Sequence, residues 1–127
     1  MVSLLLIVKN KEFLLFKRSM NGTHPGLFGL CGGTVEKGET PVDALIREVK
    51  EEIGMDIFNS NLIKRYNRNG NIMNLFAVVS NDFEEQNIRL NKEHTEWRYF
   101  TYYELLNSKE TIPTTIEFVN DFLRSYK

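Results

Sequence analysis

Residues 33–55, GTVEKGETPVDALIREVKEEIGM, decide the fold of this 127-residue chain. Thr40 suits a helix N-cap and Pro41 the first helical position, while Gly54 provides a left-handed C-terminal stop. Between these caps, apolar residues recur at three- and four-residue spacing, which is typical of a helix with one buried face. These residues are Val42, Leu45, Ile46, Val49 and Ile53. The stretch therefore predicts a glycine-rich turn followed by an amphipathic helix.

The other face of this helix is acidic. Glu48, Glu51 and Glu52 stand at positions i, i+3 and i+4, so their carboxylates crowd one exposed patch and repel one another. A divalent cation would reverse that repulsion, because hard cations take oxygen ligands. Arg47, four residues before Glu51, can hold part of the charge in place. From the glutamates alone, a solvated acidic face and a metal site both remain open.

The spacing of the whole stretch is more specific than the glutamates. Two apolar positions, Val49 and Met55, lie among seven fixed ones: Gly33, Glu39, Arg47, Glu48, Glu51, Glu52 and Gly54. At average residue frequencies, seven such positions coincide about once in 10⁸ windows. The pattern resembles the signature of the Nudix hydrolases, of the MutT-like kind, and all of its fixed residues are present.

This resemblance implies cleavage of a nucleoside diphosphate linked to another group, with Mg²⁺ or Mn²⁺ as the cofactor. It implies metal ligands at Glu48, Glu51 and Glu52, together with a backbone carbonyl at Gly32. Arg47 would orient the carboxylates, and Gly33 and Glu39 would support the site. Metal ions suit this reaction because they neutralise developing phosphate charge and lower the pKa of bound water.

Two further residues are candidates by the same resemblance. Glu93 precedes an aromatic strand and a short helical turn, where some family members place a metal ligand or general base. A solvated loop glutamate is the alternative. Either Glu52 or Glu93 would accept the proton. Arg18 ends an early strand, where the family often places a basic residue near the phosphates. A charged strand end in solvent is equally compatible with the sequence.

The chain departs from the family pattern at two positions near the glycines. Phe28 stands where tryptophan is common, and Cys31 stands where proline is common. The glycines that let a backbone approach phosphate remain. Cys31 has no neighbouring base or cation to make it a nucleophile. His24 is expected to be a surface residue, because no second His or Cys lies at ligand spacing.

The remaining pattern predicts an α+β domain with strands and helices in alternation. Residues 2–8 form a near-continuous apolar run, typical of a strand buried on both faces. Asn69-Gly70 marks a hairpin between strands at 61–67 and 71–80. A short strand is expected near Ile88, and a last helix from Thr114, with Ile116, Val119, Phe122 and Leu123 as its apolar face. The resemblance implies the Nudix fold, a mixed curved sheet between helices, over a single domain at 1–127.

Composition limits the other classes of function. The net charge of −1 gives no overall attraction to nucleic acid or anionic membranes. A single cysteine excludes an internal disulfide and agrees with a cytoplasmic location. Residues 1–8 are too short and lack the basic start of a signal peptide, and no apolar run is long enough for a membrane span.

The sequence therefore predicts a Mg²⁺- or Mn²⁺-dependent pyrophosphohydrolase with a small nucleotide substrate. Two alternatives are an RNA 5′-end pyrophosphohydrolase and a Nudix module that senses nucleotides without hydrolysing them. Residues 69–73 lack the proline or tyrosine seen in ADP-ribose and dinucleoside polyphosphate enzymes. The oligomeric state, monomer or homodimer, is left open.

Overall fold

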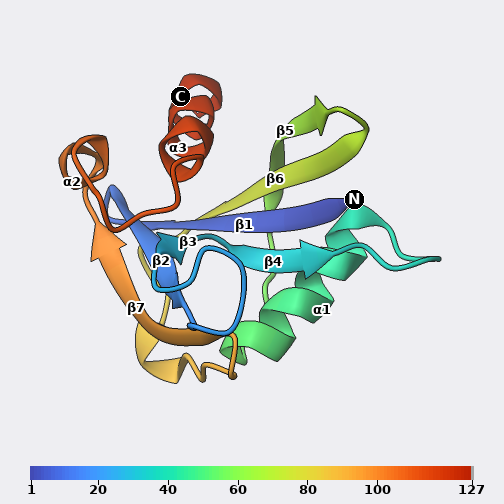
Figure 1. Cartoon of the computed structure of the whole chain (residues 1–127), viewed down its shortest axis with the longest axis horizontal. Helices are drawn as coiled ribbons and strands as arrows, with labels where there is room; N and C mark the ends of the chain where they lie inside the picture. Colours follow the sequence, from blue (N-terminus) through green and yellow to red (C-terminus); the bar gives the residue numbers. More distant parts are fainter. Residues whose placement is uncertain (127) are drawn as a thin grey trace.

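A computed structural model describes residues 1–126, which form a seven-stranded mixed sheet with helices on both faces (Figure 1). The elements in chain order are β1 (Val2–Lys9), β2 (Glu12–Arg18), β3 (Phe28–Gly29), β4 (Cys31–Thr34), α1 (Pro41–Ile53), β5 (Asn61–Arg68), β6 (Asn71–Val79), a 3₁₀ turn η1 (Glu85–Asn87), β7 (His94–Phe100), α2 (Tyr102–Leu106) and α3 (Thr115–Ser125).

β1 is the central strand and is buried on both faces, as its apolar run predicts. Leu6 and Val8 enter one hydrophobic core, and Leu5 and Ile7 enter the other. β1 runs parallel to β6 and antiparallel to β2 and β4. The sheet is therefore mixed, and one strand separates two cores.

β1 and β2 pair only near their shared turn, and the sheet opens beyond it. Residues Ile7–Lys9 pair with β2, whereas Val2–Leu5 pair with β4. β2 continues against β3 on one side and β7 on the other. The opening leaves room for β4, which brings Gly32 and Gly33 opposite Leu4 and Ser3.

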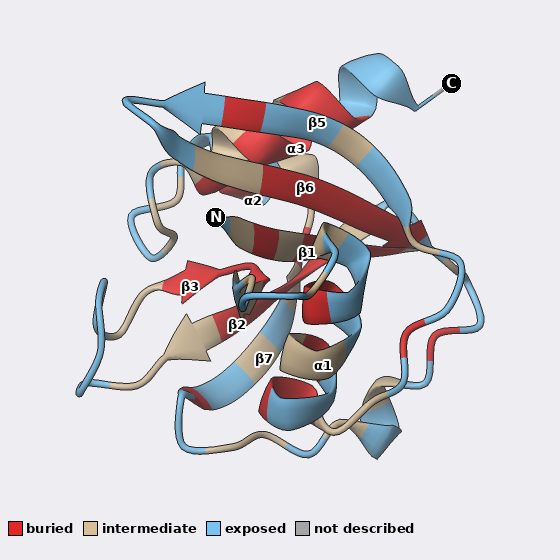
Figure 2. Cartoon of the chain, turned by 90° about the vertical axis from the view of Figure 1, so that its right-hand side faces the viewer, coloured by how far each residue is buried: buried red, intermediate tan, exposed pale blue. Residues whose placement is uncertain are grey.

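The helices cover opposite faces of the sheet (Figures 1 and 2). α1 packs through Leu45, Val49 and Ile53 against one core, and α3 packs through Phe118 and Phe122 against the other. This arrangement confirms the α+β prediction of a mixed sheet between helices. Within residues 1–126, no helix is both long and apolar enough to cross a membrane.

The predicted apolar faces of both long helices need correction. Val42 and Ile46 of α1 are 38% and 40% exposed, and Leu123 of α3 is 44% exposed. Phe118, which was not predicted to face the core, is buried in α3 instead. A helix lying on a sheet buries only the residues nearest that surface, so apolar residues at the flanks of the stripe remain in contact with water.

The predicted strand near Ile88 does not form. The chain instead makes η1 and then runs along the C-terminal end of α1. The Arg89 N–H donates to the Ile53 carbonyl at 2.8 Å, and the Asn91 N–H donates to the Glu52 carbonyl at 3.0 Å. These bonds satisfy carbonyls that the helix end leaves free. They also place the segment before β7 beside the acidic residues of α1.

The predicted hairpin is confirmed. Asn69 and Gly70 both have positive φ, 56° and 86°, and connect β5 to β6. Such angles favour a two-residue turn whose twist matches that of the strands, and asparagine and glycine adopt them most readily.

Candidate functional site

Two glutamates of α1 face the glycine backbone of β4. The helix begins where predicted, because the Thr40 side chain accepts a hydrogen bond from the Asp43 N–H at 3.2 Å. Glu48 and Glu52, one turn apart, then lie towards β4. The Glu52 Oε1 atom accepts from the Gly32 N–H at 3.2 Å.

Both glycines of β4 lie very close to neighbouring groups. A Cβ atom on Gly33 would lie 1.9 Å from the Glu48 Oε2 atom. A Cβ atom on Gly32 would lie 2.1 Å from the Ser3 carbonyl oxygen, and Gly32 also has a φ of +137°. The two glycines therefore allow the carboxylates and the β1 backbone to approach this closely.

Arg47 connects the loop before α1 to the acidic face. Its guanidinium donates two hydrogen bonds to Glu39, at 2.8 and 2.9 Å, and one to the Thr34 carbonyl at 3.0 Å. It also donates to Glu48 at 2.8 Å and to Glu51 at 3.3 Å. The Arg47 guanidinium lowers the pKa of Glu39 to about 2. This geometry fits the orienting role predicted for Arg47 and the supporting role predicted for Glu39.

The three helix glutamates differ in exposure, which corrects the prediction of a shared exposed patch. The Glu51 side chain is 56% exposed and that of Glu48 is 17% exposed, whereas Glu52 is buried at 3%. Glu52 lies nearest the edge of the apolar stripe, so the sheet covers it.

Burial determines the protonation of Glu52. It raises the pKa of this carboxyl to about 8, with the Gly32 N–H acting in the opposite direction. The negative charges of Glu93 and Glu48 contribute to this raised pKa after burial, which is the largest cause. Glu93 itself is exposed, yet its charge is close enough to act on Glu52. The structure thus brings Glu48, Glu52 and Glu93 into one negatively charged region.

His94 is a member of this site that the sequence analysis did not select. It is the first residue of β7, is 4% exposed, and its Nδ1 atom lies 3.7 Å from the Glu52 Oε1 atom. The pairing of β2 with β7 shifts by one residue between Lys17 and Arg18, so that Arg18 lies opposite His94 and not Thr95. Simple strand alternation would place Thr95 inward, and only the bulge turns His94 towards Glu52.

Arg18 lies at the edge of the site. It lines a cavity of about 280 Å³ together with Ser19, Asn21, Gly22, Lys92 and Glu93. Its Nε–H donates to the Thr23 carbonyl at 3.1 Å, which holds the guanidinium against its own loop. The cavity therefore combines two cationic side chains with the carboxylate of Glu93.

Cys31 is buried, whereas His24 lies on the surface as predicted. Cys31 is fully buried, and burial, with the nearby charge of Glu52, raises the pKa of its thiol. A protonated thiol is a poor nucleophile. His24 is exposed in the loop between β2 and β3.

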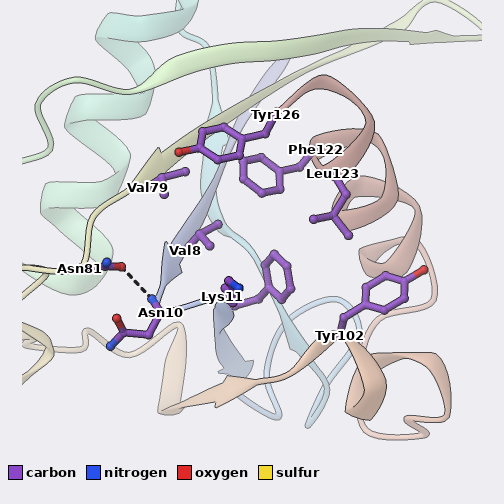
Figure 3. A pocket seen from close by; sticks show the side chains of 10 residues that line it. Val8, Asn10, Lys11, Val79, Asn81, Tyr102, Phe122, Leu123 and Tyr126 are labelled. Carbon is purple, nitrogen blue, oxygen red and sulfur yellow. Dashed lines mark hydrogen bonds between the residues drawn. The ribbon is translucent and has the colours of Figure 1, made fainter.

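A larger cavity lies away from this site. It measures about 740 Å³ and contains mainly apolar side chains from the turn after β1, the end of β6, α2 and the last turn of α3 (Figure 3). None of its lining residues belongs to the acidic site, so it is not assigned to the chemistry discussed below.

The donor atoms fit a divalent metal in kind. The carboxylate oxygens of Glu48 and Glu52 lie close enough for Glu48 to raise the pKa of Glu52, and the missing Cβ of Gly33 lets Glu48 approach β4. Such oxygens are the ligands that Mg²⁺ and Mn²⁺ take. Among residues 1–126, however, no three acidic, His or Cys side chains already converge as a metal site. Arg47 donates to Glu51 and to one oxygen of Glu48, while the other Glu48 oxygen, Oε2, lies against Gly33.

Comparison with known proteins identifies the family. The NUDIX domain model matches residues 1–122, so the chain belongs to the Nudix hydrolase family, as its signature predicts. The chain resembles the solved structure of a MutT protein from Methanosarcina mazei, with a TM-score of 0.80 and 25% identity. That match covers 99% of this chain and 94% of the other.

Two relatives of named activity are also similar. An 8-oxo-dGTP diphosphatase of Proteus vulgaris is 30% identical over 71% of this chain and 70% of its own length. An ADP-ribose pyrophosphatase of Methanocaldococcus jannaschii is 48% identical over 39% of this chain. The latter match spans only 29% of the length of that relative.

Proposed function

We propose that this protein is a metal-dependent pyrophosphohydrolase that cleaves a nucleoside diphosphate linked to another group, by attack of water on phosphorus. The observation that carries this proposal is the approach of Glu48 and Glu52 to the Gly32–Gly33 backbone. The family signature implies metal ligands at these helix carboxylates, and their approach to β4 supports that assignment.

In this proposal, Glu48, Glu51, Glu52 and the Gly32 carbonyl hold Mg²⁺ or Mn²⁺. When bound, the metal would neutralise charge on the phosphate oxygens and lower the pKa of the attacking water. Arg47 orients the carboxylates of Glu48 and Glu51 through its hydrogen bonds.

The chain's own charges provide the remaining functions. Arg18 and Lys92 line the cavity beside Glu93, where they can pair with phosphate oxygens of the substrate. Either Glu52 or Glu93 takes the proton from water. Glu93 is exposed and so accessible to water, whereas Glu52 is buried within reach of the Gly32 N–H.

The substrate class that we propose is a nucleoside triphosphate of the kind that the Proteus vulgaris enzyme is named for. That relative matches most of this chain, whereas the ADP-ribose pyrophosphatase matches 39% of it. ADP-ribose is the second candidate, because the identity in that shorter match reaches 48%.

Product analysis with a nucleotide panel tests both candidates. The panel contains 8-oxo-dGTP, the canonical dNTPs, CTP, ADP-ribose, dinucleoside polyphosphates and RNA with a 5′-triphosphate, each with Mg²⁺, Mn²⁺ or EDTA. We expect a nucleoside monophosphate and pyrophosphate from a triphosphate, with activity abolished by EDTA. Cleavage of ADP-ribose alone would favour the second candidate. Binding of nucleotide without turnover would contradict the proposed hydrolase and favour a sensing module.

A further inference from the structure

The imidazole ring of His94 is buried and has no hydrogen-bond partner among the described residues. Neither of its ring nitrogens has a hydrogen-bond partner within residues 1–126, and its side chain is 1% exposed. Buried polar groups in folded proteins are almost always hydrogen-bonded, because an unpaired one loses its bonds to water without replacement. An unpaired histidine therefore needs a physical reason for its place here.

The surroundings of the ring point to Glu52. The Phe16 ring lies on one side of His94, with ring centroids 5.7 Å apart, and offers no hydrogen-bond acceptor. The Nδ1 atom instead lies 3.7 Å from the Glu52 Oε1 atom. Closing this gap by about 0.7 Å would give an ordinary N–H···O hydrogen bond. The acceptor atom is the same oxygen that the Gly32 N–H contacts from the other strand.

The Nδ1 atom is the ring nitrogen that faces an acceptor. A neutral imidazole carries one N–H, and which nitrogen bears it depends on the available acceptor. A carboxylate 3.7 Å from Nδ1 favours the tautomer with its proton on that atom.

We propose that His94 is a positioning residue for Glu52, donating from Nδ1–H to Glu52 Oε1 so that β4 and β7 together hold this carboxylate in one orientation for metal. This inference deepens the proposed function and rests on it for the role of Glu52. Second-layer groups of this kind fix the orientation of metal ligands, and their loss typically lowers metal affinity or activity by about 10- to 100-fold.

Three substitutions separate positioning from simple packing. His94→Asn keeps an amide N–H near the place of Nδ1, His94→Gln moves it towards the place of Nε2, and His94→Leu removes it. His24→Asn is the matched control, because the chain's other histidine is exposed and has a φ of 50°, which asparagine tolerates. Each variant is assayed for Mn²⁺ affinity by calorimetry without nucleotide, for kcat and KM on the cleaved nucleotide, and for Tm.

We expect His94→Leu to weaken Mn²⁺ binding and to lower kcat by about tenfold or more, with KM changed much less. His94→Asn should recover most of both losses, and His24→Asn should match the native protein. The Tm values of the variants should not correlate with their activities, because leucine can pack against the apolar neighbours of His94, such as Phe16.

The proposal is overturned if His94→Leu keeps native Mn²⁺ affinity and kcat, or if the asparagine and leucine variants lose both equally. Recovery by glutamine and not asparagine would overturn the assignment to Nδ1. If the leucine variant does not fold, the comparison of asparagine with glutamine still decides. If the native protein hydrolyses no nucleotide, the Mn²⁺ affinities test His94 separately from the proposed hydrolase activity.

Discussion

The Glu52 carboxylate receives contacts from strands distant in sequence. One of its oxygen atoms lies 3.2 Å from the Gly32 nitrogen of β4 and 3.7 Å from the His94 Nδ1 atom of β7. Water is excluded from most of this carboxyl, so its charge is costly without a cation nearby. Its place in the fold is therefore better explained by a ligand than by a contribution to stability.

Removing that charge should separate stability from catalysis. In Glu52→Gln, the side-chain oxygen can still accept from the Gly32 N–H, while repulsion from Glu48 disappears. We expect the Tm to be unchanged or higher, and turnover to fall by about 10³-fold or more, because a metal ligand and a candidate base are lost. Thermal unfolding and nucleotide turnover measure the two effects.

Glu96→Gln provides the control, since Glu96 is exposed and pairs only loosely with Lys17 at 3.8 Å. Turnover within tenfold of native in Glu52→Gln would show that the roles assigned to this carboxylate are wrong.

β4, the following loop and α1 act as one structural unit. Arg47 contacts residues from all three parts, and the two glycines of β4 approach β1 and α1 so closely that an added Cβ would overlap a neighbouring atom. Gly32 meets a backbone carbonyl, whereas Gly33 meets the end of the Glu48 side chain. These two contacts should respond differently to the same added methyl group.

Alanine substitution at the two glycines tests this difference. Gly32→Ala should lower the free energy of unfolding by about 1–3 kcal/mol or more, because its φ of +137° strains any side chain and the Ser3 carbonyl cannot move aside. Gly33→Ala should fold with a smaller loss, since the Glu48 carboxylate can rotate away, but its Mn²⁺ affinity should fall about tenfold. Urea unfolding and calorimetry measure the two quantities. A larger loss of stability in Gly33→Ala, or native Mn²⁺ affinity there, would contradict this assignment.

The two faces of the sheet carry different polar groups. The α1 face carries the acidic site, while the α3 face is tied to the outer strand β5 by polar contacts. Asp121 of α3 accepts from the Tyr66 hydroxyl at 2.5 Å and from Arg124 at 2.5 Å, and it lies 3.6 Å from the Lys64 ammonium. Asp121 is 7% exposed, so these groups replace its contacts with water.

Because of this cluster, the free energy of unfolding should depend on pH in the acidic range. The Tyr66 hydroxyl, followed by Arg124 and Lys64, holds the pKa of Asp121 below its ordinary value. Because the pKa of Asp121 is lower in the folded state than in the unfolded state, its charged form stabilises the fold. This contribution to the free energy of unfolding is complete above the unfolded pKa, about 4, and is lost as the pH falls through the folded pKa. Asp121→Asn should therefore cost about 1–3 kcal/mol at pH 7, and the difference from native should shrink below pH 4.

Urea unfolding from pH 7 to pH 3 follows this difference, with the exposed Asp82→Asn as control. A difference between native and Asp121→Asn that is constant over this range would contradict the assigned pKa direction.

Local sequence was sufficient for the features that depend on neighbours within a few residues. The caps at Thr40 and Gly54, the hairpin at 69–70 and the doubly buried strand β1 follow from backbone preferences and short apolar patterns. The spacing of the signature also identified the family. Part of that spacing follows the helical repeat of 3.6 residues, which determines which side chains of α1 are adjacent. The roles of the signature residues in binding metal remain predictions.

Tertiary packing alone decided which of those residues are buried and what lies beside them. Helical spacing does not predict that Val42 and Ile46 are exposed while Glu52 is buried. The spacing shows which residues share a face of the helix, but not how much of that face the sheet covers. His94 reaches Glu52 only because a one-residue shift between β2 and β7 reverses the faces at the end of the strand. Strand pairing joins segments far apart in sequence, so its register depends on the whole set of contacts and not on the local pattern.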